Sequence, residues 1–97
     1  MKKIKIDIVI TRHKGLVDYL IEEGIISPQT NVVAHATPEL VRGKNVLGVL
    51  PHSLSCLCRT FTEIPLALPQ ELRGKELTRE DVRRYAGKPA TYVVKKL

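Results

Sequence analysis

The sequence lacks several features that common classes of protein require. Its 97 residues include three tyrosines, one phenylalanine and no tryptophan, too few aromatic rings for a platform that stacks single-stranded nucleic acid. No apolar run approaches the roughly 20 residues of a membrane-spanning helix. Residues 1–7 also lack the apolar core and cleavage site of a signal peptide. We therefore expect a cytoplasmic protein that has no membrane partner and requires no long nucleic acid.

Motifs for metals and common cofactors are also missing. Cys56 and Cys58 are separated by one residue, which is not a Cys-x-x-Cys spacing, and no second cysteine pair exists. We interpret them as small buried thiols on a helix, in a reducing compartment. There is no Gly-x-Gly-x-x-Gly, no Walker loop and no cluster of metal-binding carboxylates. We expect neither a metal nor a cofactor.

What the chain does contain is typical of a single small globular domain, which we assign to residues 1–97. Hydrophobic residues make up 43% of it and charged residues 27%. A chain of this length builds a modest core, so dimerisation would be a natural way to add stability. The net charge of +6 favours an anionic partner. Some of this charge lies near the chain ends, where lysines commonly protect an exposed sheet edge: Lys2, Lys3, Lys5, Lys95 and Lys96.

The apolar pattern predicts strands that alternate with helices. Strands are expected at 4–10, 31–35, 46–50, 63–68 and 91–97, and helices at 15–23, from Thr37, from Leu54 through Phe61 and from Thr78. Residues 46–50 are almost continuously apolar, which is typical of a strand covered on both faces. Pro65 makes the fourth strand an edge strand or a bulge. This order predicts a small, single-domain, Rossmann-like α/β fold with a mainly parallel sheet flanked by helices.

Two groups of polar residues follow the first and third predicted strands. They are Thr11, Arg12, His13, Lys14 and Gly15 after the first strand, and Pro51, His52 and Ser53 after the third. Ligands of open α/β sheets bind outside the carboxyl ends of the strands, so the two groups would meet at one edge if these strands are neighbours. A basic surface turn is the alternative, and Thr11 could simply cap the helix. We interpret His35 as a histidine bonded to a backbone carbonyl rather than as a catalytic one.

These side chains suit binding and proton transfer on a phosphate ester. Arg12 provides a planar fork that matches phosphate oxygens, and Lys14 adds a mobile point charge. His13 can exchange a proton near neutral pH, and His52 offers a second imidazole. Ser53 and the backbone amides that start its helix could hold an anion. The pattern is not specific to one reaction.

Four segments spread over nearly the whole chain carry a resemblance to a known family. They are Thr11-Arg12-His13 with Gly15, Val33-Ala34-His35, Val46-Leu47-Gly48-Val49-Leu50-Pro51, and Leu68-Pro69-x-Glu71-Leu72-Arg73-Gly74-x-Glu76-Leu77-Thr78 with Asp81 and Tyr85. They resemble the small accessory (Csx-type) ring nucleases encoded with type III CRISPR systems. The resemblance implies a CARF-like fold, similar in outline to domains that sense cyclic oligoadenylates. It also implies cleavage of cyclic tetra-adenylate, which switches off antiviral signalling.

The resemblance further implies a metal-independent reaction, in which a ribose 2′-hydroxyl attacks the adjacent phosphate and leaves a 2′,3′-cyclic phosphate end. Arg12 and His13 would be catalytic, the first stabilising the phosphate and the second acting as general acid or base. The expected ligand-binding residues are Thr11, Lys14, Gly15, Pro51, His52 and Ser53. A two-fold symmetric ring also suits a homodimer in which each subunit contributes one copy of the site.

Three other functions stay open. A binding-only module would sequester the cyclic nucleotide without cleaving it. A histidine phosphatase is suggested by Arg12-His13 after a first strand, but that fold needs a longer chain with a second helical layer. A nucleic-acid-binding regulator is favoured by net charge alone, and a steep salt dependence of binding would support it.

Overall fold

The structure is a computed structural model that describes residues 4–97. Over this range the chain forms five strands, four α-helices and one 3-10 helix. The strands are β1 (Ile8–Ile10), β2 (Asn31–Val33), β3 (Asn45–Gly48), β4 (Thr60–Glu63) and β5 (Ala90–Tyr92). The helices are α1 (Lys14–Glu22), α2 (Pro38–Val41), α3 (His52–Ser55) and α4 (Arg79–Tyr85), with the 3-10 helix η1 at Gln70–Leu72.

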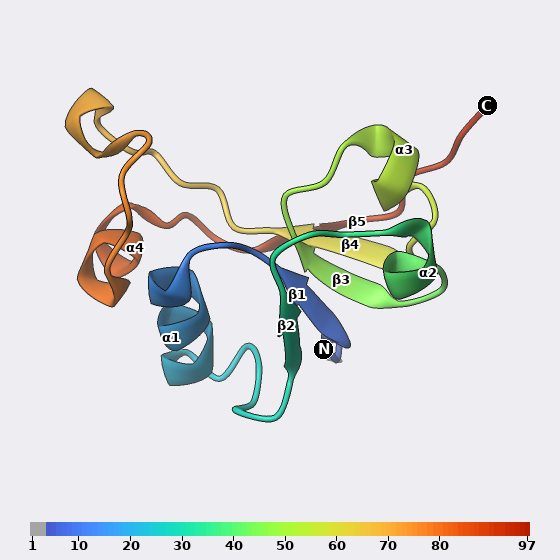
Figure 1. The fold of residues 1–97 in the computed structure, drawn as a ribbon, viewed down its shortest axis with the longest axis horizontal. Coiled ribbons are helices and arrows are strands. Elements are labelled where there is room, and N and C mark those ends of the chain that lie inside the picture. The colour runs from blue at the N-terminus through green and yellow to red at the C-terminus, as the bar shows by residue number, and fades with distance from the viewer. Residues whose placement is uncertain (1–3) are drawn as a thin grey trace.

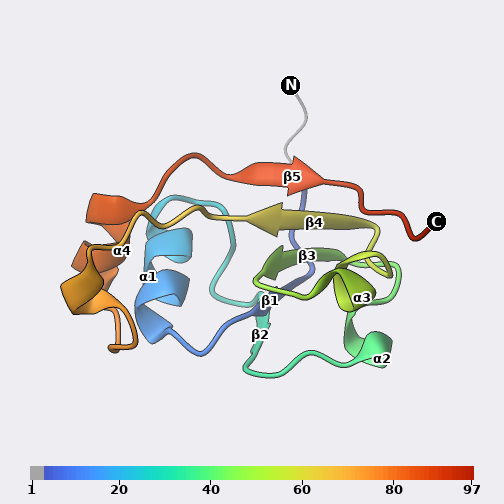
Figure 2. The same cartoon turned by 90° about the horizontal axis from the view of Figure 1, so that it is seen from above.

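The strands form one sheet in the order β2-β1-β3-β4-β5 (Figures 1 and 2). β1 pairs in parallel with β2 and with β3, and β3 pairs in parallel with β4, whereas β5 is antiparallel to β4. The predicted α/β class and mainly parallel sheet are therefore confirmed. The expectation that lysines protect an edge at the first strand is wrong for Lys5, because β1 is an inner strand. Lys2 and Lys3 lie outside the described residues.

Both faces of the central strands are covered. Val9 and Leu47 are buried in one apolar cluster with side chains of α1 and α4, while Ile8 and Val46 are buried in a second cluster with Val41 of α2. Figure 1 shows α1 and α4 together on one side of the sheet and α2 and α3 on the other. Burial on both faces explains why these two strands are apolar without alternation.

The third helix and the strand after it differ from the prediction. α3 ends at Ser55, and Phe61 lies in β4 opposite Val46 rather than on a helix. The backbone of Arg59 donates to the carbonyl oxygen of Lys44 at 2.8 Å, which starts the β3–β4 pairing. Strand pairing with β3 thus overrides the helical spacing of the apolar residues, because each backbone group in a sheet needs a partner.

The strand predicted at 63–68 is also wrong. β4 already ends at Glu63, and Pro65 has no N–H to donate to a neighbouring strand. Beyond the proline, Leu66 forms only an isolated bridge with Ala86. The chain then leaves the sheet and continues to η1. Pro65 therefore lies beyond the end of β4, which is an inner strand, and does not make a strand an edge or a bulge as predicted.

Two smaller predictions need correction. The last strand was expected at 91–97, but β5 ends at Tyr92, at the edge of the sheet. Cys56 and Cys58 follow α3 in a turn rather than lying within a helix. Cys58 is buried, and this burial raises the pKa of its thiol, whereas Cys56 is half-buried.

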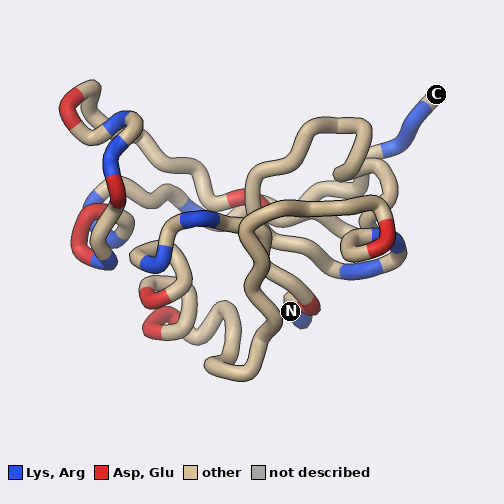
Figure 3. The backbone as a smooth tube through the Cα atoms, in the orientation of Figure 1, with Lys and Arg blue, Asp and Glu red and all other residues tan. Residues whose placement is uncertain are grey.

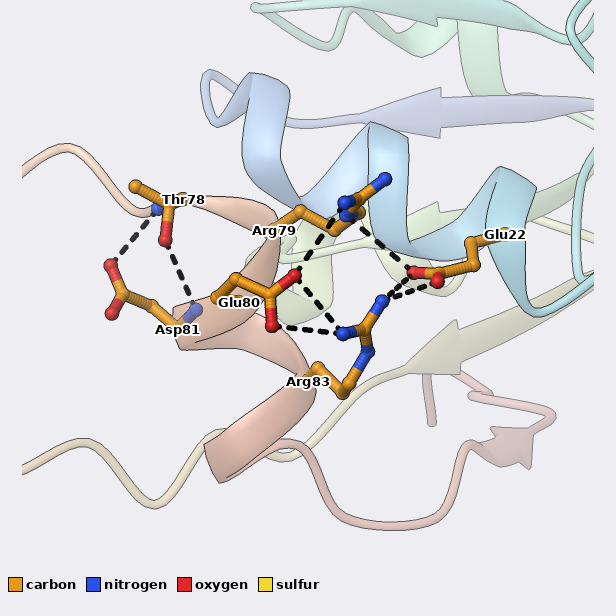
Figure 4. A network of polar contacts seen from close by, with 6 residues as sticks. All are labelled: Glu22, Thr78, Arg79, Glu80, Asp81 and Arg83. Carbon is orange, nitrogen blue, oxygen red and sulfur yellow. Dashed lines mark hydrogen bonds and ion pairs between the residues drawn. The ribbon is translucent and has the colours of Figure 1, made fainter.

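The start of α4 and its contact with α1 are held by polar groups (Figure 4). The Thr78 hydroxyl accepts from the backbone N–H of Asp81 at 3.1 Å, and the Asp81 carboxylate accepts from that of Thr78 at 3.0 Å. Arg83 bridges Glu22 of α1 and Glu80 of its own helix. The hydrogen bond from Arg83 lowers the pKa of Glu22. Exposed ion pairs add little stability, so apolar packing between the two helices contributes more.

Gly15 allows α1 to lie directly against the segment that precedes α4. The residue is buried, and a Cβ built on it would lie 2.2 Å from the carbonyl oxygen of Leu77 and 2.6 Å from the carbonyl carbon of Thr78. Backbone atoms cannot rotate away as a side chain can. The first turn of α1 therefore has room only for glycine here.

We predict that Gly15→Ala destabilises the fold by about 1–3 kcal/mol, the usual cost of overpacking. Thermal or urea unfolding followed by circular dichroism measures the change. Gly87→Ala is the matched control, because its Cβ would meet ordinary contacts starting at 3.5 Å. Equal stability of the two variants would contradict the close approach of α1 to Leu77.

Candidate functional site

The strand order creates a crevice at the carboxyl ends of β1 and β3. After β1 the chain passes through α1 to β2 on one side, then returns through α2 to β3 on the other side of β1. Ligands of open α/β sheets bind at such a divergence. Ile10 lies opposite Gly48, so Thr11 and Val49 leave the sheet at the same edge. The first and third strands are thus neighbours, which was the condition for the two polar groups to meet at one edge.

Thr11 shapes the turn between β1 and α1. Its backbone N–H donates to the carbonyl oxygen of Val33 at 3.0 Å, and its hydroxyl accepts from the backbone N–H of His13 at 3.1 Å. The residue that precedes α1 is His13, whose carbonyl oxygen accepts from Leu16 and Val17. Thr11 therefore holds the turn rather than capping the helix, which removes one alternative interpretation.

Arg12 and His13 lie between two hollows. The first, which we call the β1 hollow, has a volume of about 320 Å³ and is lined by Ile10, Thr11, Arg12, His13, Ala34 and Val49. The second, the η1 hollow, has a volume of about 340 Å³ and is lined by Arg12, His13, Leu68, Leu72, Gly74, Lys75, Glu76 and Leu77. A ligand in either hollow would meet both side chains.

Arg12 also contacts a histidine from the neighbouring strand end. Its Nη2 lies 3.3 Å from Nδ1 of His35, and both side chains are exposed. A guanidinium only donates, so the Nδ1 of His35 accepts in this contact and the neutral ring carries its proton on Nε2. The pairing orients the Arg12 fork and leaves an N–H of His35 free to donate. The interpretation of His35 as bonded to a backbone carbonyl is therefore wrong.

The His13 ring is partly buried. Its Nδ1 is shielded from solvent and has no hydrogen-bond partner among residues 4–97. A carboxylate or carbonyl at this nitrogen would fix the tautomer, but here no protein group does so. Because Nδ1 is shielded, any proton exchange between this ring and a ligand would go through Nε2.

The other predicted site residues are more dispersed. Lys14 is exposed at the first position of α1, and Gly15 is buried against Leu77, so packing explains this glycine. Pro51, His52 and Ser53 are exposed at the start of α3, at the same edge of the sheet. His52 lines a separate groove. With only four residues, α3 carries a small dipole for holding an anion.

Sequence reasoning did not include three residues that the fold brings to the site: His35, Lys75 and Glu76. His35 lies at the end of a predicted strand. This position indicates that His35 is near Arg12 only once β2 is known to pair with β1. Lys75 and Glu76 follow a Gly74 turn with a φ of 78° and reach the site only through the packing of the 64–78 connection. No local pattern in the sequence indicates that placement.

Charge is spread over the described part of the chain rather than gathered on one face. Figure 3 shows Lys and Arg on the turn before α1, around α4, beside α2 and near the C-terminus, with Asp and Glu between several of them. Among residues 4–97, no group of three or more His, Cys, Asp and Glu side chains could hold a metal ion. No helix in that range is long and apolar enough to cross a membrane.

The sequence model of one protein family, described as "Putative CRISPR-associated protein (Cas_VVA1548)", matches residues 8–95. The chain belongs to this family. The match covers the whole sheet and the turn that carries Arg12 and His13. The CRISPR association that the four sequence segments implied is therefore supported. No curated protein and no solved structure matches the chain significantly.

Proposed function

We propose that the protein is a ring nuclease with a CARF-like fold, which binds and cleaves cyclic oligoadenylate, in the first place cyclic tetra-adenylate. Cleavage would end an antiviral second-messenger signal. The observation that carries the proposal is the position of Arg12 and His13 between two hollows at the divergent strand ends. Membership of a CRISPR-associated family supports it.

The proposed reaction needs three actions from the protein. A base removes the proton of a ribose 2′-hydroxyl, whose oxygen attacks the adjacent phosphorus as the bond to the 5′-oxygen breaks. The 5′-oxygen receives a proton, and the products are a 2′,3′-cyclic phosphate and a 5′-hydroxyl. Arg12 stabilises the charge on the phosphoryl oxygens, and His13 moves a proton. His35 orients Arg12, and Lys14 adds positive field at the same turn.

Incubation of the purified protein with cyclic tri-, tetra- and hexa-adenylate in excess EDTA tests this function. We expect linear adenylates ending in a 2′,3′-cyclic phosphate, identified by mass, and the fastest conversion for the tetramer. Intact rings after prolonged incubation at excess protein would rule out the enzyme. Tight binding of an intact ring would instead support the sequestering function.

Arg12→Ala should lower the cleavage rate about a hundredfold, because a donor aimed at developing charge is lost. Arg59→Ala is the matched control: Arg59 is exposed and precedes β4, at the opposite edge of the sheet from the crevice. Arg73, on a connecting turn, is a poorer control because its neighbours Leu72 and Gly74 line the η1 hollow. The measurement compares the single-turnover rates of the wild-type protein, the Arg12 variant and the Arg59 variant. Unchanged cleavage by the Arg12 variant would show that this residue is not part of the site.

His13→Ala should slow the single-turnover rate by roughly a hundred- to ten-thousandfold while changing ring affinity much less, as expected for proton transfer. The rate is followed at saturating protein, and affinity by calorimetry on a slowly cleaved ring. Arg59→Ala is again the control, because this exposed residue lies at the opposite edge of the sheet from the crevice. A variant at His13 that loses affinity but keeps its rate would make this histidine a binding residue.

The active form is proposed to be a homodimer that shares one ring. One copy of the site offers few cationic groups for four phosphates, and a two-fold symmetric ring matches two identical chains. Light scattering at micromolar concentration should give twice the 10.9 kDa of the chain. Calorimetry should give one ring per two chains, and one ring per monomer would contradict the shared site.

A further inference from the structure

A third hollow, which we call the β5 groove, lies beside the site on the α3 face of the sheet. It has a volume of about 410 Å³, within the range of small-molecule sites. Phe61 pairs with Tyr92 across β4 and β5, so both side chains point to the face that Val46 shares with α2. Glu63, two residues after Phe61, points the same way and lines the groove with them. The wall opposite is made by His52 and Ser55 of α3.

The groove is apolar and open to solvent. Val49 is 89% exposed, Val93 69% and Tyr92 46%, although all three are large apolar or aromatic side chains. Because α3 has four residues, it covers little of the outer strands. An exposed aromatic ring flanked by valines is a surface on which a flat, apolar ring can stack.

One acidic side chain interrupts this apolar lining. The Tyr92 hydroxyl donates to Oε1 of Glu63 at 3.3 Å, while Oε2 of Glu63 has no hydrogen-bond partner in the described residues. Glu63 is therefore held by one oxygen and presents the other as a single free acceptor. A phosphate would be repelled here, whereas a ligand N–H would be bound by a charge-assisted hydrogen bond.

The groove borders on the candidate site. Val49 lines both the β5 groove and the β1 hollow, where Thr11, Arg12 and His13 lie. Cationic groups are thus found on one side of Val49, and an apolar surface with one acceptor on the other. This division matches the two halves of a nucleotide, with its phosphate at Arg12 and its base in the groove.

We propose that the β5 groove binds one adenine ring of the nucleotide, an inference that rests on the proposed function for its ligand. The ring would stack on Tyr92 and Val49, and its exocyclic amine would donate to Oε2 of Glu63. Unsubstituted purine has the same ring system but lacks the exocyclic amine, so it could stack in the groove without donating to Glu63.

The experiment uses the methyl NMR signals of Val49, Val93 and Val94 in the full chain, titrated with adenosine 5′-monophosphate and with purine riboside 5′-monophosphate, which lacks the amine. These probes do not require cleavage or binding of a cyclic oligoadenylate. We expect shifts at the groove valines, with adenosine monophosphate bound at least about tenfold more tightly than purine riboside monophosphate, as is usual for a hydrogen bond to a charged group. Circular dichroism confirms that each variant below is folded.

Glu63→Gln should largely remove the preference for adenine over unsubstituted purine, because a neutral amide oxygen accepts a weaker hydrogen bond than a carboxylate. Tyr92→Phe keeps the stacking ring but removes the hydrogen bond that holds Glu63, so this preference should fall less than in the Glu63 variant. Glu23→Gln removes the same charge at the exposed end of α1 and should leave the preference unchanged. The affinity of the Glu63 variant for cyclic tetra-adenylate should also fall.

Adenosine monophosphate without any effect on the groove valines, or a base preference that Glu63→Gln leaves intact, would overturn the proposal. So would light scattering in which Tyr92→Ala converts a dimer to a monomer, because the groove would then be covered by a second copy of the chain. Failure of the proposed function is a separate result. In that case the wild-type protein would neither bind nor cleave cyclic tetra-adenylate, whatever the monophosphates do.

Discussion

The pairing of β1 with β3 is the constraint on which the rest of the structure depends. At its carboxyl end, Gly48 approaches β1 so closely that a Cβ there would lie 2.3 Å from the carbonyl oxygen of Ile10. Its φ of 154° is also one that residues with side chains rarely adopt. Any larger residue would push the two strands apart where Thr11 and Val49 begin. The β1 hollow is lined by both residues, and the β5 groove is lined by Val49.

The parts of the fold that depend on local chemistry could be predicted from the sequence. α2 and α4 begin at the predicted Thr37 and Thr78, which cap them, since a hydroxyl before a helix accepts a hydrogen bond from a nearby free N–H of its first turn. Phe61 could not be placed in the same way. Its spacing from Leu54 and Leu57 suits a helix, and only the backbone of β3, distant in sequence, makes it a strand residue.

The residues of the candidate site also differ in whether the sequence could predict them. Arg12 and His13 could be found because they directly follow an apolar run, and the end of a strand is a local property. The residues that contact them or line the same hollows could not be found in this way. His35 contacts Arg12 because β2 pairs with β1 on the side away from β3. The order of strands in a sheet cannot be read from a single sequence. Lys75 reaches the η1 hollow only because Gly15 lets α1 pack on the segment beside it.

The turn with Arg12 and His13 has a hollow on each side. This arrangement favours a ligand that is large enough to occupy both hollows. A mononucleotide would occupy one hollow and leave the other wet, so that half of the available surface would add nothing to its affinity. A chain or ring with several phosphates can pass over Arg12 and use both hollows at once. Thr11 fixes the turn through hydrogen bonds to Val33 and His13, so the ligand rather than the backbone would have to bend. Bending over the Arg12 turn would be one way to bring a neighbouring 2′-hydroxyl in line with phosphorus, as the proposed cleavage requires.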